Sequence, residues 1–196
     1  MDTLTQQLLR QLAGGAVSQI GQKIGADEQT TNSAMAAAIP LLISALAKNA
    51  SEPTGAQALY QAVAKDHDGS ILNNVEGFLG NPQAANGAGI LNHVLGSQQP
   101  TVTQGLTKNT GLNSAQISLL LQIAAPLVMG MLGKQQKQAG LDANDLSGLL
   151  GSEKQMAEES NPDMMSTLNS LLDLNKDGSA LDDILGIAGK LFGGKK

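Results

Sequence analysis

The chain has 196 residues, no cysteine, no tryptophan and a formal net charge of −5. The missing cysteine excludes disulfides and thiolate metal sites, and the acidic balance argues against a general affinity for nucleic acid, which requires a basic face. Apolar residues make up 41%, chiefly leucine and alanine, while aromatic residues make up only 2%. Because leucine and alanine favour helices, the composition predicts an all-α protein.

The N-terminal stretch MDTLTQQLLRQLAGG has neither a basic region nor a continuous apolar run, so it does not resemble a secretory signal. We also expect no uncharged apolar run to reach the length of a membrane span. These features predict a cytoplasmic protein.

The chain aligns with itself at a shift of 86 residues, which predicts two related helical repeat units, residues 1–86 and 87–160. The alternative is that two alanine- and leucine-rich helices align by composition alone. The identical pairs include Gly25 with Gly111, Ala38 with Ala124, Pro40 with Pro126, Leu41 with Leu127 and Lys48 with Lys134.

Each unit is expected to contain a helix, a turn and a second, longer helix. Asp27 is the predicted N-cap of the longer helix in the first unit, and Asn113 or Ser114 in the second. Pro40 and Pro126 then fall at the same place inside these helices and predict a kink in each. A repeated kink indicates helices that bend around a shared core, and it does not indicate catalysis.

A shorter motif, DGSILNNVEGFLG from Asp68, recurs as DGSALDDILGIAG from Asp177 and more loosely as GAGILNHVLG from Gly87. Each copy predicts a glycine-containing turn followed by a short amphipathic helix. His67 precedes the first copy in what we expect to be a solvated turn, and His93 lies far from it in sequence. Neither histidine has a metal-binding spacing, and no nucleophile–base set or phosphate-binding glycine loop is present, so we do not expect an enzyme.

The polar stretch GSEKQMAEESNP predicts a boundary before a C-terminal helical hairpin, residues 161–196. Its loop resembles the first half of a calcium-binding loop, which alternates oxygen ligands and has glycine at the sixth position. The closing position is Ile184 rather than glutamate, so a calcium site would need an irregular ligand such as Asp183. The alternative is an acidic turn without an ion. The candidate calcium ligands are Asp173, Asn175, Asp177, Ser179 and Asp183.

The last predicted helix has an apolar stripe at helical spacing, followed by the basic end GGKK. We expect this stripe to pack on its own hairpin or on the body of the protein. The alternatives are docking on a protein partner and docking on a membrane surface, the latter disfavoured because so few basic residues are available. The stripe consists of Leu181, Ile184, Leu185, Ala188, Leu191 and Phe192.

The stretches HDGSILNNVEGFLG, GAGILNHVLG, GLNSAQISLLLQIAAPLVMGMLGKQ and GLDANDLSGLLG, in this order, resemble the bacterial YidB-like family, domain of unknown function 937. The resemblance covers roughly residues 20–152 and the tail LNKDGSALDDILGIAGKLFG. The resemblance implies an all-helical protein whose fold is partly homeodomain-like. With that fold comes the idea of DNA binding. The helix after Gly111 has no lysine or arginine between Asn113 and Gly133, which weakens the DNA interpretation.

The sequence therefore predicts an all-α protein with Pro-kinked helices in two related units and a C-terminal helical hairpin. The leading functional hypothesis is a non-enzymatic structural or protein-interaction protein that buries apolar helix faces against a protein partner or against copies of itself as a homo-oligomer. No small-molecule substrate and no certain cofactor are expected. The alternatives are a calcium-responsive module, with calcium as its ligand, and a DNA-associated protein.

Overall fold

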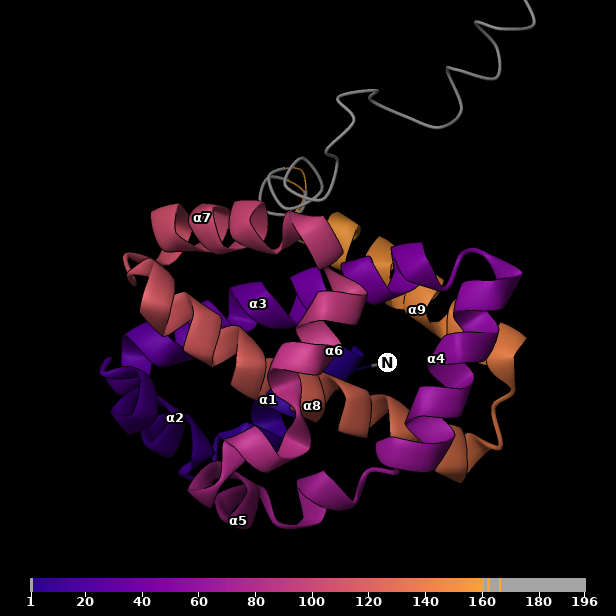
Figure 1. Ribbon diagram of the computed structural model, residues 1–196, viewed down its shortest axis with the longest axis horizontal. Coiled ribbons are helices and arrows are strands. Elements are labelled where there is room, and N and C mark those ends of the chain that lie inside the picture. Colours follow the sequence, from indigo (N-terminus) through magenta and orange to yellow (C-terminus); the bar gives the residue numbers. More distant parts are fainter. Residues whose placement is uncertain (1, 161, 163–165, 167–196) are drawn as a thin grey trace, which may run out of the picture.

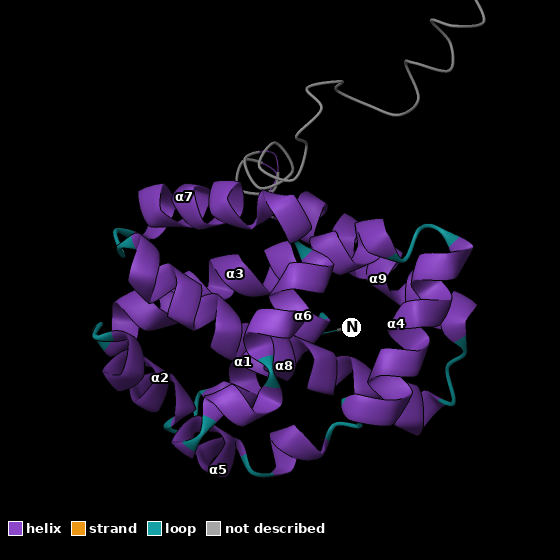
Figure 2. Ribbon diagram, viewed as in Figure 1, coloured by secondary structure: helices purple, strands orange, loops and turns teal. Residues whose placement is uncertain are grey.

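The structure is a computed structural model that describes residues 2–160, 162 and 166. Within this range it contains helices and turns but no strand, which confirms the predicted all-α class (Figures 1 and 2). The predicted C-terminal hairpin falls almost entirely outside the described residues. The helices are α1 (Leu4–Leu12), α2 (Ala16–Ile24), α3 (Glu28–Asn49), α4 (Pro53–Asp66), α5 (Val75–Gly80), α6 (Gly87–Val94), α7 (Gln99–Thr110), α8 (Ser114–Ala139) and α9 (Ala143–Ser160), with short 3₁₀ turns η1 (Ser70–Asn73), η2 (Pro82–Ala85) and η3 (Gly96–Gln98).

Helices α3 and α8 form the centre of the protein and pack against each other. Both are apolar around most of their circumference through their middle turns, which is the pattern of a helix buried on all sides. Residues 38–46 of α3 and 123–133 of α8 are buried without interruption. Figure 1 shows α2, α4, α5 and α7 arranged around this central pair. The two predicted units thus contribute to one hydrophobic core, and their boundary at residue 86 stays a prediction.

The starts of the two central helices confirm the predicted N-caps. The Asp27 carboxylate accepts a hydrogen bond from the Thr30 amide at 2.9 Å. Asn113 accepts one from the Gln116 amide at 3.0 Å, and the Gln116 side chain accepts from the Asn113 amide in return. Such reciprocal bonding satisfies amides that have no partner within the helix.

Both central helices continue through the prolines in their middle turns. Each proline lacks an amide hydrogen, so the carbonyls of Ala36 and Gln122 lose their usual helical donor. The preceding helices, α2 and α7, both end at a left-handed glycine, Gly25 with φ 71° and Gly111 with φ 75°. These shared features are what a duplication would leave behind, but the duplication itself stays a prediction.

The expectation that no segment is long and apolar enough to cross a membrane was wrong. Residues Glu28–Asn49 and Ser114–Ala139 both meet that requirement by length and composition. The most apolar window of each is largely buried in the protein, 67% and 72% respectively, as in the core helices of a folded domain. Hydropathy is therefore only weak evidence for a membrane span here.

Helix α1 is held at its start by a buried carboxylate of α9. The Glu153 Oε2 atom accepts a hydrogen bond from the Leu4 amide at 2.8 Å, and Glu153 is only 5% exposed. Burial raises the pKa of Glu153, and the bond from the Leu4 amide partly opposes that shift. The contact joins two ends of the described chain and satisfies one of the unpaired amides of α1.

We predict opposite results for two substitutions of Glu153. Glu153→Ala removes the acceptor and leaves the Leu4 amide buried without a partner, so it should lower the free energy of unfolding by about 1–3 kcal/mol. Glu153→Gln keeps an acceptor without a buried charge and should be at least as stable as the natural chain at neutral pH. Because the folded-state pKa of Glu153 is raised, any advantage of glutamine should disappear as the pH falls and Glu153 takes up a proton. Urea unfolding of the three proteins tests this, and a glutamine variant as unstable as the alanine variant would contradict it.

Candidate functional site

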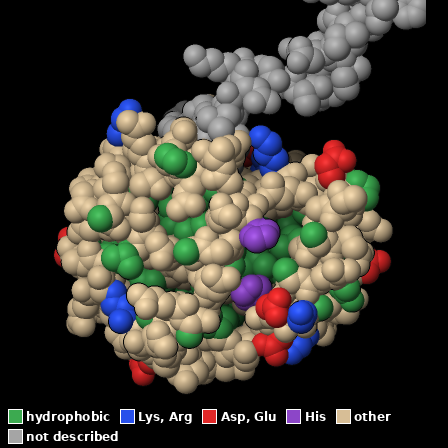
Figure 3. All heavy atoms as spheres, in the orientation of Figure 1, with side chains coloured by type: hydrophobic (Ala, Val, Ile, Leu, Met, Phe, Trp, Pro, Cys, Tyr) green, Lys and Arg blue, Asp and Glu red, His purple; other side chains and the backbone are tan. Residues whose placement is uncertain are grey.

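Both histidines of the chain line an open groove between α4 and α6, which we call the α4–α6 groove. Its volume is about 430 Å³. Figure 3 shows histidine side chains beside a recessed group of hydrophobic side chains. The groove is lined by Leu46, Asn49, Gly55, Ala58, Leu59, Ala62, Asp66, His67, Asn86, Ile90, His93, Val94 and Met129.

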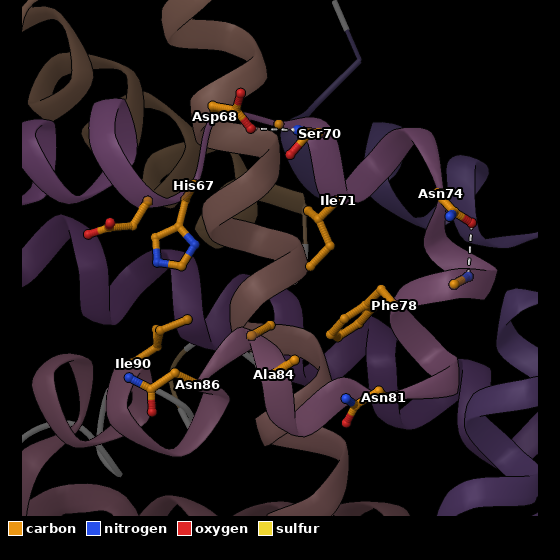
Figure 4. A pocket seen from close by; sticks show the side chains of 14 residues that line it. His67, Asp68, Ser70, Ile71, Asn74, Phe78, Asn81, Ala84, Asn86 and Ile90 are labelled. Atoms are coloured by element: carbon orange, nitrogen blue, oxygen red, sulfur yellow. Dashed lines mark hydrogen bonds between the residues drawn. The ribbon is translucent and has the colours of Figure 1, made fainter.

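A second cavity of about 650 Å³, which we call the Phe78 cavity, adjoins the groove (Figure 4). The two share four lining residues, Asp66, His67, Asn86 and Ile90. In Figure 4 the His67 and Phe78 side chains point into the cavity from opposite sides. The Phe78 cavity is more polar than the groove, since asparagines 74, 81 and 86 and the backbone turn after His67 contribute to its lining.

One wall of the groove is positioned where the end of α4 meets α8 without an intervening side chain. A Cβ atom added to Gly133 of α8 would lie 1.7 Å from the carbonyl oxygen of His67. Only glycine allows the two backbones to approach this closely. The close approach places the His67 side chain at the junction between the groove and the Phe78 cavity.

The other wall is positioned by a similar contact at the start of α6. A Cβ atom on Gly87 would lie 1.9 Å from the Gln122 carbonyl oxygen, one of the two carbonyls deprived of a helical donor by a proline. At its far end, α6 is tied to α3, because the Asn49 side-chain amide donates to the Val94 carbonyl at 2.9 Å. The groove therefore lies between two helices that are both fixed to the core.

His67 is half-buried, which corrects the expectation of a solvated turn. Burial lowers the pKa of His67, and the nearby Asp66 carboxylate opposes this shift more weakly. The neutral imidazole is therefore favoured in the folded protein. Within the part of the chain that the structure describes, no hydrogen bond joins the His67 ring to a carboxylate or a hydroxyl group. The ring here acts as a partly apolar surface that would acquire a charge in acid.

The neighbouring Asp68 is occupied by contacts within the protein. Its carboxylate accepts hydrogen bonds from Lys137 at 2.7 Å and from the Ser70 amide at 3.0 Å. The bond from Lys137, followed by those from Ser70, holds the pKa of Asp68 far below its usual range. Asp68 thus closes the turn after α4 and ties it to α8.

The site residues predicted from the sequence are not placed by the structure. The candidate calcium ligands, Asp173 to Asp183, and the apolar stripe, Leu181 to Phe192, lie outside the described residues. Among residues 2–160, 162 and 166, no group of three or more histidine, aspartate or glutamate side chains is placed to hold a metal ion. The groove itself was not predicted. The only signal for it in the sequence was the pair of glycines, Gly130 and Gly133, inside the apolar pattern of α8.

We predict that an added methyl group at Gly133 will destabilise the protein. Gly133→Ala removes a conformational cost of glycine in a helix, about 1 kcal/mol, but forces the His67 backbone away from α8. Overpacking of this kind typically costs about 1–3 kcal/mol, so the net effect should be a loss of stability. The matched control is Gly148→Ala in α9, where a new Cβ atom would meet nothing within 4 Å and should be stabilising. Thermal or urea unfolding measures both, and a gain of stability in both variants would contradict the close contact.

We further predict that His67 makes stability fall in mild acid. Its folded-state pKa lies below the ordinary value of 6.5, so the unfolded chain binds a proton more readily. The contribution of neutral His67 to stability is therefore fully present above pH 6.5, and it is lost as the pH falls from 6.5 through the folded-state pKa. Urea unfolding at about pH 7.5 and at about pH 5.5, a range in which histidine titrates, measures this effect. The loss of unfolding free energy between the two pH values should be smaller in His67→Gln than in the natural chain. Equal losses in the two proteins would contradict this assignment.

Comparison with known proteins gives a family but no described activity. A family model, described as a bacterial protein of unknown function (DUF937), matches residues 6–135. This range includes every residue that lines the α4–α6 groove and the Phe78 cavity. No curated protein and no solved structure matches the chain. Since the match covers well over half of the sequence, the chain belongs to the DUF937 family of bacterial proteins, as its sequence motifs predicted.

Proposed function

We propose that the protein is a non-enzymatic interaction protein that binds an apolar helical segment of a protein partner, or of another copy of itself, in the α4–α6 groove. The observation that carries this proposal is an open, mainly apolar groove between two helices that are fixed to the core. Leu46, Leu59 and Met129 are almost fully buried core residues that reach its lining. An amphipathic helix laid into such a groove is a recurring mode of peptide recognition.

The rest of the described surface offers little else for an apolar contact. Among the residues that the structure describes, Leu119 is the one large hydrophobic side chain that counts as exposed, at 43%. The other apolar helix faces of the described residues pack largely into the core. An interaction through apolar contacts is therefore better served by the recessed lining of the groove than by an external helix face.

The dimensions of the groove suit a short helix. Its α4 wall has 14 residues and its α6 wall has 8, which correspond to lengths of about 21 Å and about 12 Å. Small side chains, Ala58 and Ala62, lie one turn apart along the α4 wall. They leave room for the larger apolar side chains of two to three turns of an incoming helix.

The alternatives are supported less well. For DNA binding, the helices that follow the two turns, α3 and α8, would have to present a face to a groove of the duplex. Their middle turns are instead buried in the core. For calcium binding, the candidate loop lies beyond the described residues, so its support remains the sequence pattern alone.

A photo-crosslinking residue in the groove tests the proposal. The exposed Ala58 would be replaced in the full-length protein by p-benzoylphenylalanine, and the protein irradiated in its native bacterial cell. We expect a discrete adduct, identified by mass spectrometry as a segment rich in leucine, isoleucine or phenylalanine. The matched control is the same substitution at Ala64, which is also exposed on α4 but does not line the groove. Equal adducts at both positions, or none at Ala58, would overturn the proposal.

A further inference from the structure

The chain contains a candidate occupant for its own groove. The structure and sequence together point to the C-terminal segment, residues 177–193, as the apolar segment that the α4–α6 groove binds within the same molecule. This inference rests on the proposed function of the groove and specifies its regulation: a protein partner would have to displace the chain's own segment.

The first argument is that the same motif already serves as a docking segment elsewhere in the protein. DGSILNNVEGFLG, residues 68–80, begins with the turn in which the Asp68 carboxylate accepts from the Ser70 amide, and it packs η1 against α8 and α5 against α2. It does so by burying Leu72 and Leu79 in the core. The C-terminal copy repeats the Asp-Gly-Ser start and places Leu181 at the position of Leu72. The body of the protein offers this second copy an apolar surface that remains open, the α4–α6 groove.

The second argument concerns the length and chemistry of the segment. Residues 181–192 have apolar side chains at helical spacing, and a helix of these twelve residues would be about 18 Å long, between the lengths of the two groove walls. The side chains available to it are the buried floor residues, Leu46, Leu59 and Met129, and the small wall residues of α4. Burying such a stripe removes apolar surface of both partners from water, which drives association.

The third argument is that the connecting chain is long enough to bring the segment to the groove. Residues 161–180 connect the end of α9 to the apolar stripe of the segment, which begins at Leu181, and 20 residues span at most about 70 Å. A body of this size has a radius of gyration of about 15 Å, so the connection extends to any point on its surface. A tether of this kind gives an effective concentration on the order of millimolar. Even a modest intrinsic affinity is then enough to keep the groove filled.

Charge favours one direction of binding. The segment has Asp182 and Asp183 near its start and Lys190 near its end. Asp66 lies at the C-terminal end of the α4 wall and forms no ion pair with any of the described residues. If the segment binds as a helix parallel to α4, and thus antiparallel to α6, its Lys190 lies toward the Asp66 carboxylate.

The test uses the full-length protein with p-benzoylphenylalanine at position 58, purified and irradiated. Trypsin cleaves after Lys176 and Lys190, so the expected adduct joins the α4 peptide to residues 177–190, which mass spectrometry identifies directly. Mixing isotopically labelled and unlabelled chains before irradiation shows whether the two peptides belong to one molecule. We expect adducts of uniform label at all protein concentrations.

A matched pair of substitutions examines the stripe itself. Leu185→Asp places a charge on the stripe and should reduce the adduct at least tenfold. Gly186→Asp adds the same charge away from the stripe, since at about 100° per residue Gly186 lies roughly opposite the centre of the stripe. It should leave the yield within about twofold. Circular dichroism of each variant checks that the body remains folded, and a fully folded Leu185→Asp protein with an unchanged adduct would overturn the inference.

The possible outcomes separate this inference from the proposed function. An adduct with residues 177–190 of the same chain supports this inference and shows that the groove binds an apolar segment, which the proposed function requires. Mixed-label adducts would assign the groove to a second copy, and an adduct formed only with a different protein in cells would assign it to a partner. Either result would overturn binding within one molecule and leave the proposed function standing. Absence of any adduct, both in cells and in the purified protein, would overturn both.

Discussion

The contact between α3 and α8 is the constraint on which the rest of the structure depends. Each helix is apolar around most of its circumference through its middle turns, so this part of neither helix has a side that favours water. Burying both requires the remaining helices to cover them, and the order of the chain supplies those helices on either side of each central one. Even the polar caps serve this arrangement, since the Gln116 side chain that closes the capping box of α8 also donates to the Gly25 carbonyl at the end of α2.

The groove is a consequence of how tightly the covering helices are attached. At Gly133 and Gly87 there is no side chain between backbones, so α4 and α6 are drawn close to α8 at one point each. Neither helix packs against the other among the principal contacts of the fold. The space between them is therefore left open, and its floor consists of side chains that already belong to the core. Proline contributes as well, because the carbonyl that Pro126 frees at Gln122 is the one against which α6 begins.

Much of the fold could be predicted from the sequence because its signals are local. The N-caps Asp27 and Asn113 and the left-handed glycines after α2 and α7 act within a few residues of the structure they determine. The groove could not be predicted in this way. Its determining contact joins His67 and Gly133, which are 66 positions apart, and a glycine in the middle of a helix indicates close packing without identifying the distant residue that it meets. For the same reason His67, considered only beside its two neighbouring aspartates, was expected to be solvated, whereas it lies half-buried where the end of α4 meets α8.

Composition explains why a recessed surface, and not a reactive centre, is the feature most worth testing. With few charged residues and no cysteine, the chain has few groups that could be activated by their surroundings. The Asp68 carboxylate, whose pKa is held far below its usual range, closes a turn, and the Glu153 carboxylate, whose pKa is raised by burial, holds the start of α1. What remains at the groove is an apolar floor, small wall residues and a half-buried imidazole. Such a surface gains free energy by excluding water from another apolar segment, and protonation of its imidazole would oppose that gain. Binding at the groove would thus be weakened by acid through the same residue that links the groove to the Phe78 cavity.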